Sequence, residues 1–414
     1  YSRNEATFIA YNQVNLQNVY SALRSPATCA AAPGCTPLNI FGVITPQMAN
    51  YIRFNGHDEQ TAEQFDFAAN VSRTLFSLPG GPVGFAAGYE YRRESAEDLP
   101  DAFANSLSTV LPLVSGAAQL PTTAQARDPT SGSYNLQEVY AEVNLPLLTN
   151  APLVYSLDVD LAARYSDYST VGDRTTGKIG VAWRPVSDLL VRATFSQGFR
   201  APSILELYQG SRQTNFQAVD PCNGGGAGRP GCAGIPVTYN QNLYGSGAIA
   251  GVTAGNPNLE AETSETVALG LAFTPAALPG LSFTMDWFRI DVEDAIASQT
   301  ATQILQSCAN RLVYCDLVNR AATGEVLELR QAVVNLASIE VEGVDAGARY
   351  QFDTGIGDFE ASLDVSYLER YRTSIPQPDG SILVDDRAGL SNQPRSTFPR
   401  WKAQAGLRWD SGPW

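Results

Sequence analysis

The segment YSLDVDLAARYSDY, Tyr155–Tyr168, carries the pattern on which the fold depends. Apolar and polar side chains alternate along it, and a period of two residues predicts a β-strand with two unlike faces. One face carries Tyr155, Leu157, Val159, Leu161, Ala163 and Tyr165. The other carries Ser156, Asp158, Asp160, Ala162, Arg164 and Ser166. The fold therefore depends on which medium lies against each face.

Two architectures produce this alternation. In a soluble sandwich or barrel, the apolar face packs in a core and the polar face meets water. In an outer-membrane barrel, the apolar face contacts lipid and the polar face lines a wet lumen. The rest of the chain has to decide between them.

The composition narrows the choice. The 414 residues carry a formal net charge of −15 without any basic cluster, so nucleic acid is not expected as a partner, because phosphate binding requires concentrated positive charge. A soluble chain of this length would be expected to divide into domains, yet no shift in composition marks a boundary. No run of about 18 apolar residues occurs, which excludes a transmembrane helix. Only a closed barrel could then cross a bilayer.

The six cysteines fall into three local pairs, each in a stretch without strand periodicity. No histidine or second cysteine pair stands at zinc spacing, so we expect loop disulfides and an oxidising compartment, with reduced thiols as the alternative. The expected pairs are Cys29 with Cys35, Cys222 with Cys232, and Cys308 with Cys315. The last pair would lie about 10 Å apart along one continuous helix, so its pairing requires a turn between Asn310 and Val313.

About twelve segments alternate in this way, and they are longer than the five or six residues usual in soluble sheets. They lie near residues 5–14, 63–77, 83–95, 134–148, 153–168, 175–185, 189–199, 262–274, 281–296, 335–353, 359–373 and 399–409.

The connections between these segments alternate between short turns and long loops, which is typical of an outer-membrane barrel. The short turns are LPGGP, TNAP, RPVSD, PAALPG and TGIGD, and the long loops are 15–62, 96–133, 200–261, 297–334 and 374–398. The brief connection 169–174 is an exception. All cysteines fall in the long loops, so we expect the disulfides at one end of the barrel.

The charged faces are expected to point into a lumen, because Arg or Lys on the lipid face costs ~2–4 kcal/mol near the bilayer midplane. Asp158, Asp160 and Arg164 are therefore predicted to line it. The predicted fold is an all-β, antiparallel transmembrane β-barrel with long extracellular loops and short periplasmic turns.

Two motifs lie in the chain at and after the end of the strand predicted near residues 189–199. The first, FRAPS with a following Glu-Leu, comprises Phe199, Arg200, Ala201, Pro202, Ser203, Glu206 and Leu207. The second, NPNL, comprises Asn256, Pro257, Asn258 and Leu259 and is followed by Glu262. In this order they resemble the barrel of TonB-dependent outer-membrane receptors, although Ala261 stands where the family often has proline. Similar stretches, such as EVYAEVNLPLL, extend the resemblance over nearly the whole chain.

The resemblance implies part of a barrel of about 22 strands. The family's plug domain, its TonB-contacting box and its last strands are not recognisable, so we expect residues 1–414 to be one partial barrel domain. The implied function is active import of a scarce, bulky ligand, such as an iron–siderophore or an oligosaccharide, without enzymatic activity or a cofactor. The implied partners are the TonB–ExbB–ExbD complex, outer-membrane lipid and lipopolysaccharide.

Several residues are candidates for this function. By analogy with the family, the candidate partners of plug arginines are Glu138, Glu142, Glu260 and Glu262, and simple solvation is the alternative for each. The loop aromatics that could stack on a ligand are Tyr208, Phe216, Tyr239 and Tyr244. Both motifs are expected to be structural rather than ligand-binding, since Pro202 fixes φ and redirects the chain.

Two rival functions stay open. A passive porin or adhesin barrel would share the fold but should lack the two motifs and a plug. A secreted β-rich enzyme acting on carbohydrate would need two carboxylates converging in a cleft, whereas here the acids are spread over the polar faces of all strands. His57 is the single histidine, which removes histidine triads and multi-histidine metal sites, so no metal site is expected.

Overall fold

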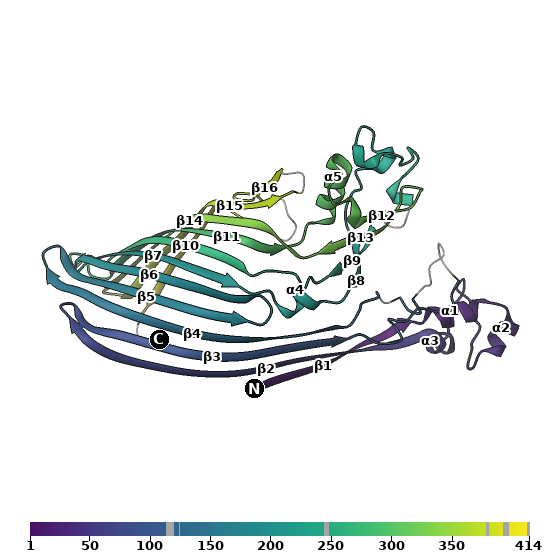
Figure 1. Ribbon diagram of the computed structural model, residues 1–414, viewed down its shortest axis with the longest axis horizontal. Helices are drawn as coiled ribbons and strands as arrows, with labels where there is room; N and C mark the ends of the chain where they lie inside the picture. Colours follow the sequence, from purple (N-terminus) through teal and green to yellow (C-terminus); the bar gives the residue numbers. More distant parts are fainter. Residues whose placement is uncertain (113–119, 124, 244–247, 378–380, 392–396, 412–414) are drawn as a thin grey trace.

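The computed structural model describes residues 1–112, 120–123, 125–243, 248–377, 381–391 and 397–411. Its main element is an antiparallel sheet of 13 strands, called the wall below (Figure 1). Their order is β1-β2-β3-β4-β5-β6-β7-β10-β11-β14-β15-β16, with β17 also paired to β15. The wall strands are β1 (Ser2–Val14), β2 (Arg53–Leu78), β3 (Gly81–Leu99), β4 (Thr130–Ala151), β5 (Val154–Tyr168), β6 (Gly172–Val186), β7 (Leu189–Arg200), β10 (Glu262–Phe273), β11 (Leu281–Ala297), β14 (Val334–Thr354), β15 (Gly357–Pro376), β16 (Ile382–Asp386) and β17 (Trp401–Asp410).

All twelve predicted strands are confirmed, and the largest error in a boundary concerns β2. This strand begins at Arg53 rather than near residue 63, so the first long loop is shorter than predicted. His57 consequently lies in a strand, opposite Ile9 of β1. Apart from Phe54, the added part of β2 carries no large apolar side chain, so it shows no alternation. The short strand β16, which pairs with the end of β15, has no counterpart among the predictions.

The alternation seen in one segment continues across the wall. Leu161 of β5 lies opposite Val143 of β4 and Ile179 of β6, while its neighbour Ala162 lies opposite residues of the polar face. Leu161 and Ile179 remain 40% and 44% exposed, so the chain does not cover this apolar face. The register therefore gives the wall one apolar and one polar face, as predicted.

The two ends of the wall differ. The short turns lie at the left of Figure 1, and the helices and long loops lie at the right. Aromatic rings gather near the short turns, where Phe352 stacks on Tyr350 and Phe359, and Phe359 stacks on Trp409, with centroids 5.1–6.2 Å apart. Aromatic side chains at the end of an apolar belt are typical of membrane barrels.

A second sheet in the long loops was not predicted. Its order is β12-β13-β9-β8, and β13 and β9 run parallel. Its strands are β8 (Arg212–Phe216), β9 (Ile249–Ala254), β12 (Val318–Arg320) and β13 (Val326–Ala332). The same loops contain the helix α5 (Ala301–Arg311) and the short 3₁₀ helices η1 (Asn223–Gly225), η2 (Pro230–Cys232), η3 (Gln241–Leu243) and η4 (Cys315–Leu317). We call the described residues of 211–254 and 298–333 the cap. Its core contains Ile304 of α5 and Leu329 of β13, which are at most 1% exposed.

Two of the three predicted disulfides stabilise the cap. Cys308 lies on α5, which ends at Arg311, and Leu312 then adopts a left-handed conformation with φ of 61°. This turn brings the Cα atoms of Cys308 and Cys315 to 4.8 Å, as the spacing required. The Cys222–Cys232 loop packs against α5 through Gly231, where an added Cβ would lie 2.0 Å from the carbonyl oxygen of Cys308.

A buried ion pair closes the cap. Asp220 is 1% exposed, and its Oδ1 accepts a 2.8 Å hydrogen bond from Nη2 of Arg320. Its Oδ2 accepts a 2.8 Å bond from the hydroxyl of Tyr239. Burial opposes ionisation of Asp220, but the hydrogen bonds from Arg320 and from the Cys222 N–H hold its pKa below its usual value. The carboxylate is therefore charged and fully engaged.

The first long loop contains three short helices, α1 (Leu16–Leu23), α2 (Pro26–Ala31) and α3 (Pro46–Ile52). The third predicted disulfide, Cys29–Cys35, closes its middle with a Cα–Cα distance of 5.3 Å. None of the helices in the described residues has the length and apolarity that a membrane span requires.

Candidate functional site

The FRAPS motif forms the junction between the wall and the loops. β7 ends at Arg200, the chain turns at the buried Pro202, and α4 (Ile204–Tyr208) begins after Ser203. The Ser203 hydroxyl accepts a hydrogen bond from the Glu206 N–H at 3.3 Å, and the Glu206 carboxylate accepts one from the Ser203 N–H at 2.8 Å. This reciprocal capping box stabilises the start of α4.

Arg200 joins α4 to the wall. Its guanidinium donates to both oxygens of Glu206, at 2.8 and 3.1 Å, and to both oxygens of Glu262 on β10, at 2.6 and 2.8 Å. Burial opposes ionisation of Glu206, yet the hydrogen bonds from Arg200 outweigh it and hold the pKa of this carboxyl below its usual value. Bidentate pairs of this kind fix orientation as well as distance. We call these three residues the clamp.

The NPNL motif meets the same junction. The Asn256 N–H donates to the carbonyl of Glu206 at 2.8 Å, which places the segment against α4. Asn256 Nδ2 donates to the carbonyl of Val333, and Asn256 Oδ1 accepts from the Asn258 N–H. Leu259 is 4% exposed. The two motifs are therefore in direct contact, and their groups form the connection between wall and cap.

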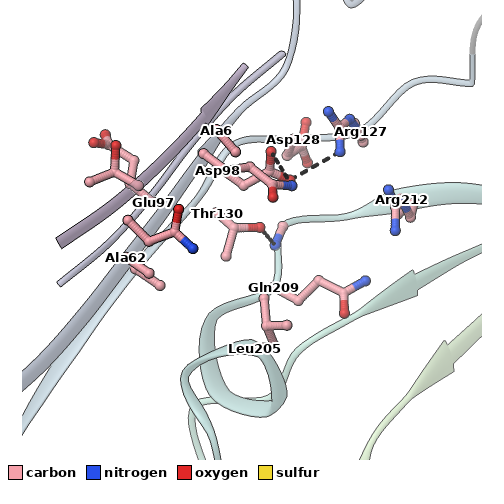
Figure 2. A pocket seen from close by; sticks show the side chains of 15 residues that line it. Ala6, Ala62, Glu97, Asp98, Arg127, Asp128, Thr130, Leu205, Gln209 and Arg212 are labelled. Atoms are coloured by element: carbon pink, nitrogen blue, oxygen red, sulfur yellow. Dashed lines mark hydrogen bonds and ion pairs between the residues drawn. The ribbon is translucent and has the colours of Figure 1, made fainter. Parts of the chain in front are cut away.

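A pocket of about 310 Å³ lies beneath α4, against the polar face of the wall (Figure 2). Leu205 of α4 and Gln209, which follows the helix, form one side, and Ala6 of β1, Ala62 of β2 and Asp98 of β3 form the other. α4 lies over β4, where a Cβ added to Gly132 would come within 2.2 Å of the Tyr208 ring. The pocket is therefore built from the polar face and the segment that follows FRAPS.

Charged groups line part of the pocket. Arg127 is held by Asp98 at 3.0 Å and by Asp58 at 2.6 Å, so its charge is neutralised. Arg212 and Asp128 also line it and are exposed, and neither has an ion pair within the part of the chain that the structure describes. The pocket can thus offer both signs of charge to a polar ligand.

Sequence reasoning missed this pocket. Arg127 lies in the long loop 96–133, where a charged residue carries no periodic signal, and its partners Asp58 and Asp98 are on two different strands. The β-bridge between Arg127 and Arg212 joins two loops that are distant in sequence. No local pattern could have brought these residues together.

The predicted lumen residues lie on the polar face, except for Glu260, which precedes β10, but their surroundings differ. Glu138 is 7% exposed, and its carboxylate accepts hydrogen bonds from Arg164 at 3.0 Å and from Ser166 at 2.5 Å. Arg164 also lies over the ring of Tyr140, 5.3 Å from its centroid. Glu138 therefore has its partners inside the wall.

The other predicted lumen carboxylates form fewer hydrogen bonds and ion pairs. Asp160 accepts a 2.8 Å hydrogen bond from Asn144. Glu262 belongs to the clamp, and the exposed Glu260 is bound through its backbone to Asn335. Among the described residues, the side chains of Glu142 and Asp158 have no hydrogen-bond or ion-pair partner.

The predicted ligand aromatics lie mostly in packed surroundings. Tyr208 lies against Gly132, Phe216 packs on the cap core, and Tyr239 is 4% exposed and bonded to Asp220. Tyr244 lies outside the described residues. Their assignment to a ligand stays a prediction. Within the described ranges, no group of three or more His, Cys, Asp or Glu side chains could hold a metal ion.

A family model described as "TonB dependent receptor-like, beta-barrel" matches residues 1–414. The comparison with curated proteins found no match. Among solved structures, a mutant of the ferric enterobactin receptor PfeA from Pseudomonas aeruginosa, in complex with enterobactin, is 15% identical, with a TM-score of 0.47 over 89% of this chain and 41% of that chain.

Two further structures are similar to the same degree. The siderophore receptor PirA from Acinetobacter baumannii is 15% identical, with a TM-score of 0.48 over 86% of this chain and 49% of its own. The iron transporter FrpB from Neisseria meningitidis is 16% identical, with a TM-score of 0.46 over 88% of this chain and 42% of its own. The chain thus spans less than half the length of each, and these scores are too low to transfer a ligand.

Proposed function

The chain belongs to the TonB-dependent receptor β-barrel family, and on that premise we propose that it forms part of an outer-membrane active transporter that imports a scarce, bulky ligand. The match over residues 1–414 is the observation that carries this proposal. The wall supports it, because its apolar face suits outer-membrane lipid and lipopolysaccharide, whereas its polar face suits a lumen. Transport of this kind requires no covalent chemistry and no cofactor.

The ligand is proposed to be polar, either an iron–siderophore complex or an oligosaccharide, and to contact the pocket beneath α4. Arg212 and Asp128 supply charged groups there that no ion pair neutralises within the described chain. The TonB–ExbB–ExbD complex would supply the energy by acting on a plug domain that fills the lumen.

The polar face would hold that plug through selected carboxylates. Glu138 and Glu262 already have arginine partners within the wall, so we assign them to wall structure. The exposed Glu142 and the half-buried Asp158 have no such partner among the described residues, and a carboxylate facing a plug arginine would gain an ion pair. We therefore propose these two as plug contacts.

The transport proposal is tested by uptake into cells that carry the full-length gene. Labelled iron–siderophore and labelled maltodextrin are compared with and without a proton-gradient uncoupler. Uptake of one ligand that stops with the uncoupler is the expected result. Uptake that ignores the uncoupler would favour a passive porin and overturn the proposal.

The plug contacts are tested with paired variants in the same assay. Glu142→Gln with Asp158→Asn should lower energy-dependent uptake several-fold, because the plug loses two ion pairs, while the wall remains folded. The control Glu59→Gln removes an exposed carboxylate of β2 that does not line the pocket beneath α4 and lies away from both positions, and it should leave uptake and the plug unchanged. Unchanged uptake and unchanged protease resistance of the plug in the double variant would contradict the assignment.

A further inference from the structure

A second cavity, of about 490 Å³, lies in the cap. Ser211 lines it, whereas the neighbouring Gly210 and Arg212 line the pocket beneath α4. The start of β8 therefore separates the two cavities. Small-molecule sites typically have volumes of about 300–1,000 Å³, so the second cavity is large enough for a compound with two fused rings.

The lining of this cavity is mainly apolar. Val252 of β9, Ile304 of α5 and Leu317 of η4 contribute aliphatic groups, and Tyr314 contributes a ring. The charged side chains in the lining are Glu328 and Arg330, and these form an ion pair with each other at 2.7 Å. No charge in the lining is therefore left for an ionic ligand, and the cavity suits a neutral one.

One polar group in the lining is unsatisfied. Gln299 is 5% exposed, and its Oε1 has no hydrogen-bond donor in the part of the chain that the structure describes. Its backbone carbonyl is occupied, because it accepts a hydrogen bond from the Gln331 side chain. An enclosed acceptor without a donor is unfavourable and uncommon in folded proteins. The oxygen has less than 1 Å² of exposed surface, so a ligand that donates one hydrogen bond to the Gln299 amide would remove this cost once the side chain rotates toward the cavity.

We propose that the cap cavity is a binding site for a neutral, mainly apolar ring compound that donates one hydrogen bond to Gln299. Val252, Ile304 and Tyr314 would contact the ring system, and the paired Glu328 and Arg330 would remain at the edge. The site is distinct from the pocket beneath α4. The proposal does not depend on transport, since it concerns binding to the cap alone.

The test measures binding of two probes to the full-length protein held in an amphipathic polymer. 2-Naphthol carries a donor hydroxyl, and 2-methoxynaphthalene has the same ring without a donor. Probe contact is followed by saturation-transfer NMR, and affinity by titration. The variant Ala332→Trp fills the cavity from an exposed residue of its lining. Probe binding that remains in this variant therefore reports partition into the polymer.

The expected result is that 2-naphthol binds about five- to tenfold more tightly than 2-methoxynaphthalene, the range of one hydrogen bond. Gln299→Met keeps the length of the side chain and should abolish this preference, whereas the control Gln306→Met, on the exposed side of α5, should preserve it. Equal affinities for the two probes, an unchanged preference in Gln299→Met, or full binding in Ala332→Trp would overturn the proposal.

Discussion

The wall and the cap are stabilised in opposite ways. In the wall, large apolar side chains such as Leu161 and Ile179 are 40–44% exposed on one face, and the strands are held mainly by their neighbours. In the cap, Leu305 and Leu329 are completely buried, and two disulfides close the loops around them. The wall thus requires an external apolar phase, whereas the cap is packed like a small soluble domain.

Their ion pairs differ in the same sense. Arg192 and Asp286 on the wall form a bidentate pair, but their side chains are 52% and 30% exposed. Arg320 and Asp220 in the cap are 15% and 0% exposed. Solvent screens the Arg192–Asp286 pair, so it contributes little to stability. Breaking the Arg320–Asp220 pair would leave a buried charge without a partner.

Asp220→Ala should be the most destabilising of these substitutions. It leaves the Arg320 guanidinium buried without its carboxylate, so the cap should lose about 3–5 kcal/mol of stability against local unfolding. Hydrogen-exchange mass spectrometry of cap peptides in the full-length protein measures this loss. The wall peptides should keep their protection.

The matched control is Asp286→Ala, which breaks the exposed pair. It should cost no more than about 1 kcal/mol, because Arg192 remains solvated. If both substitutions had equal effects, the distinction between a solvated wall pair and a buried cap pair would be lost.

The next effect concerns the two faces of the wall. Leu161→Arg places a charge on the apolar face and should cost ~2–4 kcal/mol of folding free energy in a bilayer. Ala162→Arg, one residue later, lies between Glu142 and Lys178 on the polar face and should cost much less. Urea titration of the protein in lipid vesicles, followed by tryptophan fluorescence, compares the two. A reversed order would mean that the faces are wrongly assigned.

The smallest of the three effects is the loss of one cap disulfide. Cys308→Ser with Cys315→Ser opens a short loop and should lower cap stability by about 2–3 kcal/mol in the chain-entropy model. Hydrogen exchange should increase at α5 and η4. The control Cys29→Ser with Cys35→Ser opens a loop of similar size among α1–α3 and should leave the cap unchanged, and a loss of cap protection in this control would break the comparison.

Sequence reasoning predicted the wall well because its signal is local. The alternation of Leu161 with Ala162 is enough to assign faces, since neighbouring residues on a strand must point to opposite sides. The same holds for the short turns between strands. The turn after α5 was also predictable, because disulfide geometry limits how far apart Cys308 and Cys315 can lie.

The loops were predicted much less completely. β13 pairs with β9 in parallel, across a long stretch of chain that includes β10 and β11. Neither strand carries a sequence pattern that indicates the other as its partner. From the sequence, the clamp residues could be recognised only as members of the two motifs, without their contacts. That Arg200 binds both Glu206 and Glu262 depends on the register that places β10 beside β7.

The strand pattern, the two faces of the wall, the grouping of long loops and the cysteine pairs could all be predicted from the order of the residues, because they follow from side-chain period and local chain geometry. The cap sheet, the burial of Asp220 with Arg320, the pocket beneath α4 and the unsatisfied amide of Gln299 become visible only in the folded chain. Each of these joins residues far apart in the chain, and such contacts depend on how the elements pack in space rather than on the order of neighbouring residues.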